Sequence, residues 1–229
     1  YLIYYMSNET MSLSPLDGRY ANKLGDVALL FNNGSFTYYK LFVECEYLKF
    51  MLAEISELIH LKQANFSKMF TMIDNICHDF QKNINRECNL INEIEKTTNH
   101  DVQALILYIK KKLPENIQHI VHLGLTSQDI NSPAMMLTYK EFNNSILQPD
   151  LTSLINVLDD ISDNNKQTIM LSFTHGQPAT PTTFSHQIDI FKHKLITIKT
   201  ELFKEYHYKT KMGGSNGNLT ALKMTFPSK

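Results

Sequence analysis

Three short segments place a histidine beside hydroxyl, amide or carboxylate groups, and these are the residues best suited to chemistry. The segments are Thr97–Asp101, His122–Asp129 and Thr174–Pro181. A histidine can give or take a proton near neutral pH. Free N–H groups at the start of a helix can bind a phosphate or a carboxylate. The chemistry open to these segments is therefore proton transfer and anion binding.

The first two segments also have a purely structural interpretation. Thr98 and Asp101 have the spacing of a helix capping box, with Asp in place of the usual Glu. A capping box needs no histidine, so the first segment alone favours a simple helix start. Thr126 and Asp129 repeat the spacing, but there the hydroxyls of Thr126 and Ser127 could also hold an anion. Both interpretations stay open for the second segment.

The third segment is a loop in which one glycine and two prolines fix the backbone around His175. A single loop histidine is more often incidental, but three such segments at helix ends together favour an assembled site. The histidines form no HxxxH or HxH pair, and none of the segments holds a cysteine. We therefore expect neither a metal nor a cofactor.

The elements that must position these segments are predicted to be helices, which gives an all-α fold. Helices are expected at 36–58, 64–84, 99–112, 127–163 and 183–208, between the few glycines and prolines. Two apolar seams advance by alternate steps of four and three residues, as in helices that pack in a bundle. Their members are Leu147, Leu151, Leu154, Leu158 and Ile161, then Phe184, Ile188, Phe191, Leu195, Ile198 and Leu202. Each seam needs partner helices. A further apolar stripe, expected in the core, comprises Leu41, Leu48, Met51, Leu52 and Ile55.

Composition excludes several classes of protein. The 229 residues carry 22 basic and 23 acidic side chains, a net charge of −1, so neither nucleic acid nor an anionic membrane is an expected partner. No stretch approaches the ~20 apolar residues of a membrane span. Three cysteines without CxxC spacing fit a reducing compartment, so a cytoplasmic location is expected.

We expect two domains, an amino-terminal helical domain at 12–115 and the first part of a central helical bundle at 116–229. The chain starts at Tyr1, with Met6 and Met11 following. Residues 1–11 are therefore interpreted as an upstream extension.

Five segments, in order and spacing, resemble the adenylosuccinate lyase family of the fumarase and aspartase superfamily. They are Ser14–Tyr20, Glu95–Val102, Thr126–Asn131, Thr174–Pro181 and the glycine-rich Lys211–Asn218. The resemblance covers about residues 12–226 and corresponds to the amino-terminal half of the family. It implies an all-helical homotetramer in which each active site is built from several subunits. The implied reaction is β-elimination of fumarate from adenylosuccinate, giving AMP, and from the succinyl-aminoimidazole carboxamide ribotide of purine biosynthesis.

The resemblance also implies roles for individual residues. His175 matches the family's general acid, and His122 would polarise or orient it. His100 is a further candidate catalytic residue. The residues implied to bind the substrate are Arg19 and Tyr20 at the nucleotide, Asn99, His100 and Asp101 elsewhere on the substrate, and Thr126 and Ser127 at the succinyl carboxylate or the phosphate.

The sequence departs from the family in one place, because it contains no segment like the serine loop, S-S-x-M-P-x-K-x-N, that supplies the general base. We expect a truncated chain that is inactive as it stands. The alternatives are a non-catalytic helical scaffold derived from this fold, or a sister enzyme such as argininosuccinate lyase, fumarase or aspartase.

Overall fold

The computed structural model describes residues 14–55, 66–204 and 208–227. Contacts within the chain divide it into two compact units. The first unit comprises Tyr1–Tyr139 and Lys209–Lys229, and the second comprises Lys140–Tyr208. The expected extension at 1–11 lies outside the described residues. The all-α prediction is confirmed, since the only strands in the described part form one small hairpin. None of its helices is long and apolar enough to cross a membrane. The predicted domains at 12–115 and 116–229 stay a prediction.

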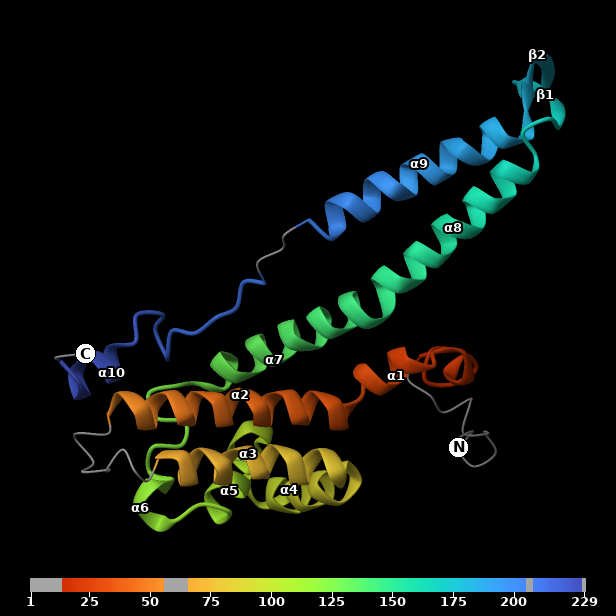
Figure 1. The fold of residues 1–229 in the computed structure, drawn as a ribbon. Coiled ribbons are helices and arrows are strands. Elements are labelled where there is room, and N and C mark those ends of the chain that lie inside the picture. The colour runs from red at the N-terminus through yellow and green to blue at the C-terminus, as the bar shows by residue number, and fades with distance from the viewer. Residues whose placement is uncertain (1–13, 56–65, 205–207, 228–229) are drawn as a thin grey trace. The chain divides into compact units, whose positions relative to one another are not determined.

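The first unit is a cluster of helices in which α2 packs against α3, α4 and α5 (Figure 1). A 3₁₀ turn at Ala21–Lys23 leads into the first helix. The helices are α1 (Asp26–Leu30), α2 (Asn33–Glu54), α3 (Phe66–Lys82), α4 (Ile84–Thr98), α5 (Asp101–Lys111), α6 (Glu115–Gln118), the start of α7 (Ser127–Phe142) and α10 (Thr220–Thr225).

Large apolar side chains fill the space between these helices. The fully buried ones include Leu41, Leu48, Leu52, Ile73, Phe80, Leu105, Ile109, Ile117 and Ile120. The apolar stripe predicted on α2 is buried throughout, so that prediction is confirmed. The Phe80 ring meets the Tyr108 ring edge-on, with centroids 6.4 Å apart. This ring contact joins α3 to α5.

Helix boundaries differ from the predictions where local capping decides them. Helix α2 begins at Asn33 rather than 36, because the Asn32 side chain accepts a hydrogen bond from the Ser35 N–H at 2.9 Å. No helix was predicted between residues 85 and 98, and this was wrong. Helix α4 occupies that stretch and buries Ile91 against the core.

The second unit is a helical hairpin that carries a short β-hairpin (Figure 1). The predicted helix at 127–163 is present as α7, a π-helical turn at Asn143–Leu147, and α8 (Gln148–Asn164). The π turn comes just before Pro149, which lacks the N–H that an α-helix interior requires. Strands β1 (Ile169–Thr174) and β2 (Gln177–Thr183) then pair antiparallel, and α9 (Phe184–Leu202) follows. The third polar segment was expected to be a loop, and it is instead the turn and second strand of this hairpin.

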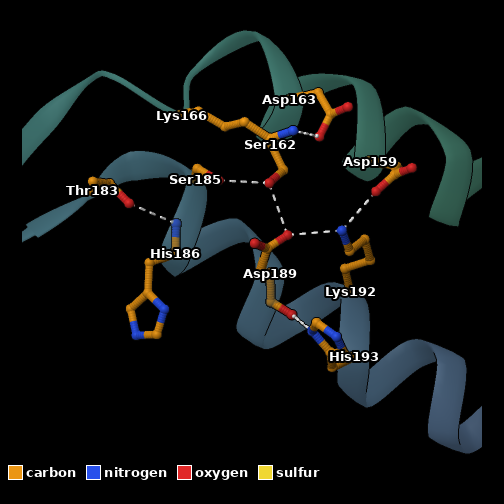
Figure 2. Close-up of polar contacts among 10 residues, drawn as sticks. All are labelled: Asp159, Ser162, Asp163, Lys166, Thr183, Ser185, His186, Asp189, Lys192 and His193. Atoms are coloured by element: carbon orange, nitrogen blue, oxygen red, sulfur yellow. Dashed lines mark hydrogen bonds and ion pairs between the residues drawn. The ribbon is translucent and has the colours of Figure 1, made fainter.

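A polar cluster fixes the register of α8 against α9 (Figure 2). The buried Ser162 hydroxyl contacts the Ser185 hydroxyl and donates to Asp189 Oδ1, each at 2.8 Å. Lys192 Nζ lies 2.6 Å from Asp159 Oδ1 and 2.8 Å from Asp189 Oδ1, and these hydrogen bonds raise the pKa of Lys192. By contrast, the seam residues Leu154, Phe191, Ile198 and Leu202 are exposed. The seams therefore lie partly uncovered in this chain.

Candidate active site

The first two polar segments meet at the starts of α5 and α7. His100 is the N-cap of α5, where its Nδ1 accepts a hydrogen bond from the Gln103 N–H at 3.3 Å. Asn99 precedes it in the left-handed conformation, with φ 50°, and so ends α4. The His100 Nε2 lies 3.2 Å from the Ser127 hydroxyl. In the neutral ring, Nδ1 accepts and Nε2 therefore carries the proton, facing Ser127.

The capping box predicted for the first segment was wrong. The N-cap is His100 rather than Thr98, whose hydroxyl instead donates to the His100 carbonyl at 3.1 Å. The Asp101 carboxylate is paired with the buried Lys40, at an Nζ–Oδ2 distance of 2.9 Å. Burial raises the pKa of Asp101, but the hydrogen bonds from Lys40 and the Val102 N–H, together with the charge of Lys40, outweigh burial and hold that pKa below its usual value. Asp101 is thus an anion beside His100.

The second segment is held by Asp129, a fully buried carboxylate. It accepts hydrogen bonds from the Thr126 N–H at 2.7 Å, the Thr126 hydroxyl at 2.9 Å and the Gly213 N–H at 2.7 Å. Lys211 Nζ lies 2.8 Å away and Gly214 N–H 3.3 Å away. Burial opposes ionisation, but Lys211 and these donors lower the pKa of Asp129 to about 2. Asp129 therefore joins the start of α7 to the glycine-rich stretch.

These contacts separate the roles open to Thr126 and Ser127. Both donors of Thr126 are directed at Asp129, and its oxygen also accepts from Lys211 Nζ at 2.8 Å. Thr126 thus shapes the loop. Ser127 keeps its hydroxyl beside His100, and the first N–H groups of α7 have no partner within the helix. Ser127 is better placed than Thr126 to bind an anion, although the binding role of both stays a prediction.

His122 is held from the other side by α2. Its Nδ1 lies 2.5 Å from Oε1 of Glu44, whose side chain is completely buried. The residue has a φ of +64°, in the left-handed region. Next to it, the Tyr47 hydroxyl donates to the Leu123 carbonyl at 2.6 Å. Burial, then the charges of Glu44 and Asp129, raise the pKa of Tyr47 to about 12, so it stays a donor.

Sequence reasoning missed the residues that support the motifs. Lys40, Glu44 and Tyr47 recur on α2 at steps of four and three, which places them on one helical face. The signal that could have revealed them is a stripe of polar residues along a helix that was predicted only to pack in the core. Lys211 was visible as the first residue of the glycine-rich stretch, but no role was assigned to it.

The structure does not connect every predicted residue to this cluster. The Arg19 guanidinium donates to the Tyr20 hydroxyl and lies over its ring, 4.7 Å from the centroid. No hydrogen bond between described residues links this pair to His100 or Ser127. His175 belongs to the second unit, where it forms the exposed β-hairpin turn with Gly176, at φ +52° and +73°. Positive φ at both residues is typical of a type I′ turn.

Comparison with known proteins identifies the family. The family described as lyase matches residues 30–228, which is most of the chain. This chain belongs to the lyase family. The resemblance inferred from the motifs is also confirmed: an adenylosuccinate lyase of Dictyostelium discoideum is 34% identical over 96% of this chain. Those of Buchnera aphidicola from Schizaphis graminum and of Legionella pneumophila strain Corby are each 32% identical, over 96% and 94% of this chain.

This lyase chain spans about half the length of the curated relatives it matches, 48% of the Dictyostelium enzyme and 47% of the Legionella one. Solved structures support the fold. A fumarate lyase from Mesorhizobium sp. BNC1 matches this chain with a TM-score of 0.62 and 18% identity. The match covers 86% of this chain and 44% of the fumarate lyase. A β-carboxy-cis,cis-muconate cycloisomerase from Acinetobacter calcoaceticus matches with a TM-score of 0.67 and 19% identity, over 86% of this chain and 44% of the cycloisomerase. At such identities the match establishes the fold alone.

Metal binding has no visible site in the described ranges, which contain no group of three or more His, Cys, Asp or Glu side chains able to hold an ion. The expected absence of a metal and of a cofactor stays a prediction.

Proposed function

We propose that the protein containing this chain is an adenylosuccinate lyase, a carbon–nitrogen lyase that releases fumarate from succinyl-amino nucleotides. The observation that carries the proposal is the contact between His100 and Ser127, 3.2 Å apart at the starts of α5 and α7. It joins two of the motifs that carry the resemblance to adenylosuccinate lyases, and the chain is 34% identical to the adenylosuccinate lyase of Dictyostelium discoideum. The named relatives are adenylosuccinate lyases, and the proposal extends that activity, and with it a role in purine biosynthesis, to this protein.

The proposed reaction requires one proton to leave carbon and one to reach nitrogen. A base takes the proton from the succinyl carbon next to a carboxylate. The electron pair forms the double bond of fumarate while the carbon–nitrogen bond breaks, and the departing nitrogen takes a proton from an acid. We assign the acid to His175, with His122 orienting it, since an imidazole suits proton transfer near neutral pH.

The cluster in the first unit would bind the substrate's anionic groups. Charge grows on the succinyl carboxylate as the neighbouring carbon loses its proton. The Ser127 hydroxyl and the N–H groups at the start of α7 are donors suited to that charge. His100, with Asn99 and Asp101 on either side, would contact the same substrate. Arg19 and Tyr20 would contact the nucleotide.

We further propose a cytoplasmic homotetramer with active sites shared between subunits. The partly uncovered seams of α8 and α9 support assembly, because exposed apolar stripes on long helices are stabilised by partner helices. The sequence contains no counterpart of the serine loop that would supply the base. The proposal therefore concerns the full protein encoded by the gene.

The test is a substrate panel with the purified full protein. Adenylosuccinate should yield AMP and fumarate in equal amounts, whereas argininosuccinate, malate and aspartate should not react. Ser127→Ala should lower kcat/KM by about 10- to 100-fold, since a hydrogen bond to a charged group contributes ~1.5–3 kcal/mol. Ser67→Ala, at an exposed position on α3, is the matched control and should leave kcat/KM unchanged. Turnover of a sister substrate instead, or of no substrate, would refute the proposal and favour a sister lyase or a non-catalytic scaffold.

A further inference from the structure

Glu44 is a buried carboxylate that packing alone does not explain. It lies in the middle of α2, with its side chain completely buried among the core residues of that helix. Oε1 contacts His122 Nδ1 at 2.5 Å, but Oε2 has no hydrogen-bond partner among the described residues. A buried oxygen without a partner costs stability, because water satisfied it in the unfolded chain.

Glu87 shows how the same unit buries a carboxylate that serves structure. Its Oε2 accepts from the Tyr108 hydroxyl at 2.6 Å and from Lys112 Nζ at 3.1 Å. Burial would raise the pKa of Glu87, but these two donors lower it overall. The Glu44 side chain, in contrast, makes its one hydrogen bond among the described residues to a histidine. The difference between the two carboxylates indicates that the role of Glu44 is to bind His122.

The contact determines how His122 can act. An ionised carboxylate can only accept hydrogen bonds, so beside an ionised Glu44 the shared proton lies on His122 Nδ1. Nε2 is then the ring nitrogen left with a lone pair when His122 is neutral. The loop around the ring is fixed too, because Tyr47 binds the Leu123 carbonyl and Leu222 packs directly over Gly124. Both the tautomer and the position of the ring are thus set from outside the loop.

We propose that Glu44 is a positioning residue that acts through His122, holding the ring with Nδ1 protonated so that Nε2 faces the reaction. The inference rests on the proposed lyase function for its effect on turnover. Its structural half, the proton on Nδ1, does not depend on that function. The two halves can therefore be tested separately.

Glu44→Gln in the full protein is the first test. The new amide has one oxygen and one NH₂ group, and no donor among the described residues reaches the position of Oε2, so the amide oxygen can occupy that position without losing a hydrogen bond. The amide should therefore turn its NH₂ toward His122 Nδ1, which moves the ring proton to Nε2. Nitrogen-15 NMR of the neutral ring should show Nδ1–H in the parent protein and Nε2–H in the variant. The kcat for adenylosuccinate should fall by about 10- to 100-fold, as for other partners that orient a functional imidazole, with KM changing much less.

Glu44→Met separates positioning from stability. Methionine fills a similar volume without a charge, and because His122 can be neutral, the substitution leaves no buried charge unpaired. The variant should stay as thermally stable as the parent, yet lose kcat to a similar degree. Glu87→Gln is the matched control, a buried carboxylate in the same unit whose loss should affect stability but leave kcat unchanged.

The outcomes are distinguishable. If the parent ring carries its proton on Nε2, or if both Glu44 variants fold and keep normal kcat, the inference is refuted while the lyase function stands. If the parent shows Nδ1–H that Glu44→Gln reverses but has no activity on succinyl-amino nucleotides, the proposed function fails and Glu44 still positions His122.

Discussion

Asp129→Asn should reduce the acid sensitivity of the first unit. The Asp129 carboxylate has a pKa of about 2 in the folded chain, against 3.8 for an ordinary aspartate. Each pKa unit is worth about 1.4 kcal/mol, so ionised Asp129 adds about 2 kcal/mol to the free energy of unfolding. Because the folded pKa is the lower one, this contribution is complete above about pH 5. It is lost as the pH falls from about 4 to 2.

The assay is urea unfolding of the parent and the variant at a series of pH values from about 7, where aspartate is ionised, down to about 2, where an ordinary aspartate is protonated. Asparagine cannot ionise and places an NH₂ group among the donors Lys211, Gly213 and Thr126, so Asp129→Asn should be less stable at neutral pH by ~3–5 kcal/mol. The difference between parent and variant should shrink by about 2 kcal/mol between pH 5 and pH 2. Asp163→Asn, at an exposed ion pair with Lys166, is the control and should behave as the parent. A parent–variant difference that stays constant with pH would refute the assignment of Asp129 as the buried anion that holds the loop.

Two further predictions concern the hairpin and the loop at His122. His175→Gln in the full protein should lower kcat by about 10²–10⁴-fold, ~3–5 kcal/mol in barrier, with little change in KM. The control, His186→Gln at an exposed position of α9, should leave kcat unchanged. A large rise in KM at normal kcat would instead make His175 a binding residue. Gly124→Ala should destabilise the first unit by more than the ~1–2 kcal/mol that positive φ alone costs, because the new Cβ would lie 2.5 Å from Leu222 Cγ. Gly176→Ala, at a similar φ of +73° in open space, isolates the backbone cost in the same denaturation measurement, and equal losses in the two variants would show that Leu222 moves aside freely.

Much of the fold could be predicted because its helices are specified by local patterns. The apolar stripe of α2 and the seams of α8 and α9 follow helical spacing, and the helices appeared where those patterns lie. Prediction failed where tertiary context decides. The β-hairpin pairs residues that have no strand alternation, and its turn depends on His175 and Gly176 both adopting positive φ. Helix α4 has a short apolar face that was overlooked beside its many polar residues.

The candidate site divides in the same way. For Thr126 and Asp129, motif spacing left a capping box and an anion-binding site both open, and the Asp129 carboxylate does accept from the Thr126 N–H. Spacing also predicted Thr98 as a cap, but the imidazole of His100 took that position. Contacts across long stretches of chain, such as Lys211 with Asp129, could not be inferred from local spacing. They depend on how the glycine-rich stretch returns to the start of α7.

The buried charges of α2 locate the site independently of the motifs. Lys40 and Glu44 occupy a helix whose other buried positions are apolar except for Thr37, and burying an ionic group costs several kcal/mol unless its partner compensates. A helix required only to pack would be more stable with apolar residues at both positions. Lys40 instead binds Asp101, and Glu44 binds His122, so each of the first two motifs receives one buried charge from the same helical face. Stability is given up at the two places where a side chain next to a proposed substrate contact must be held still, and this is expected of the support for an active site.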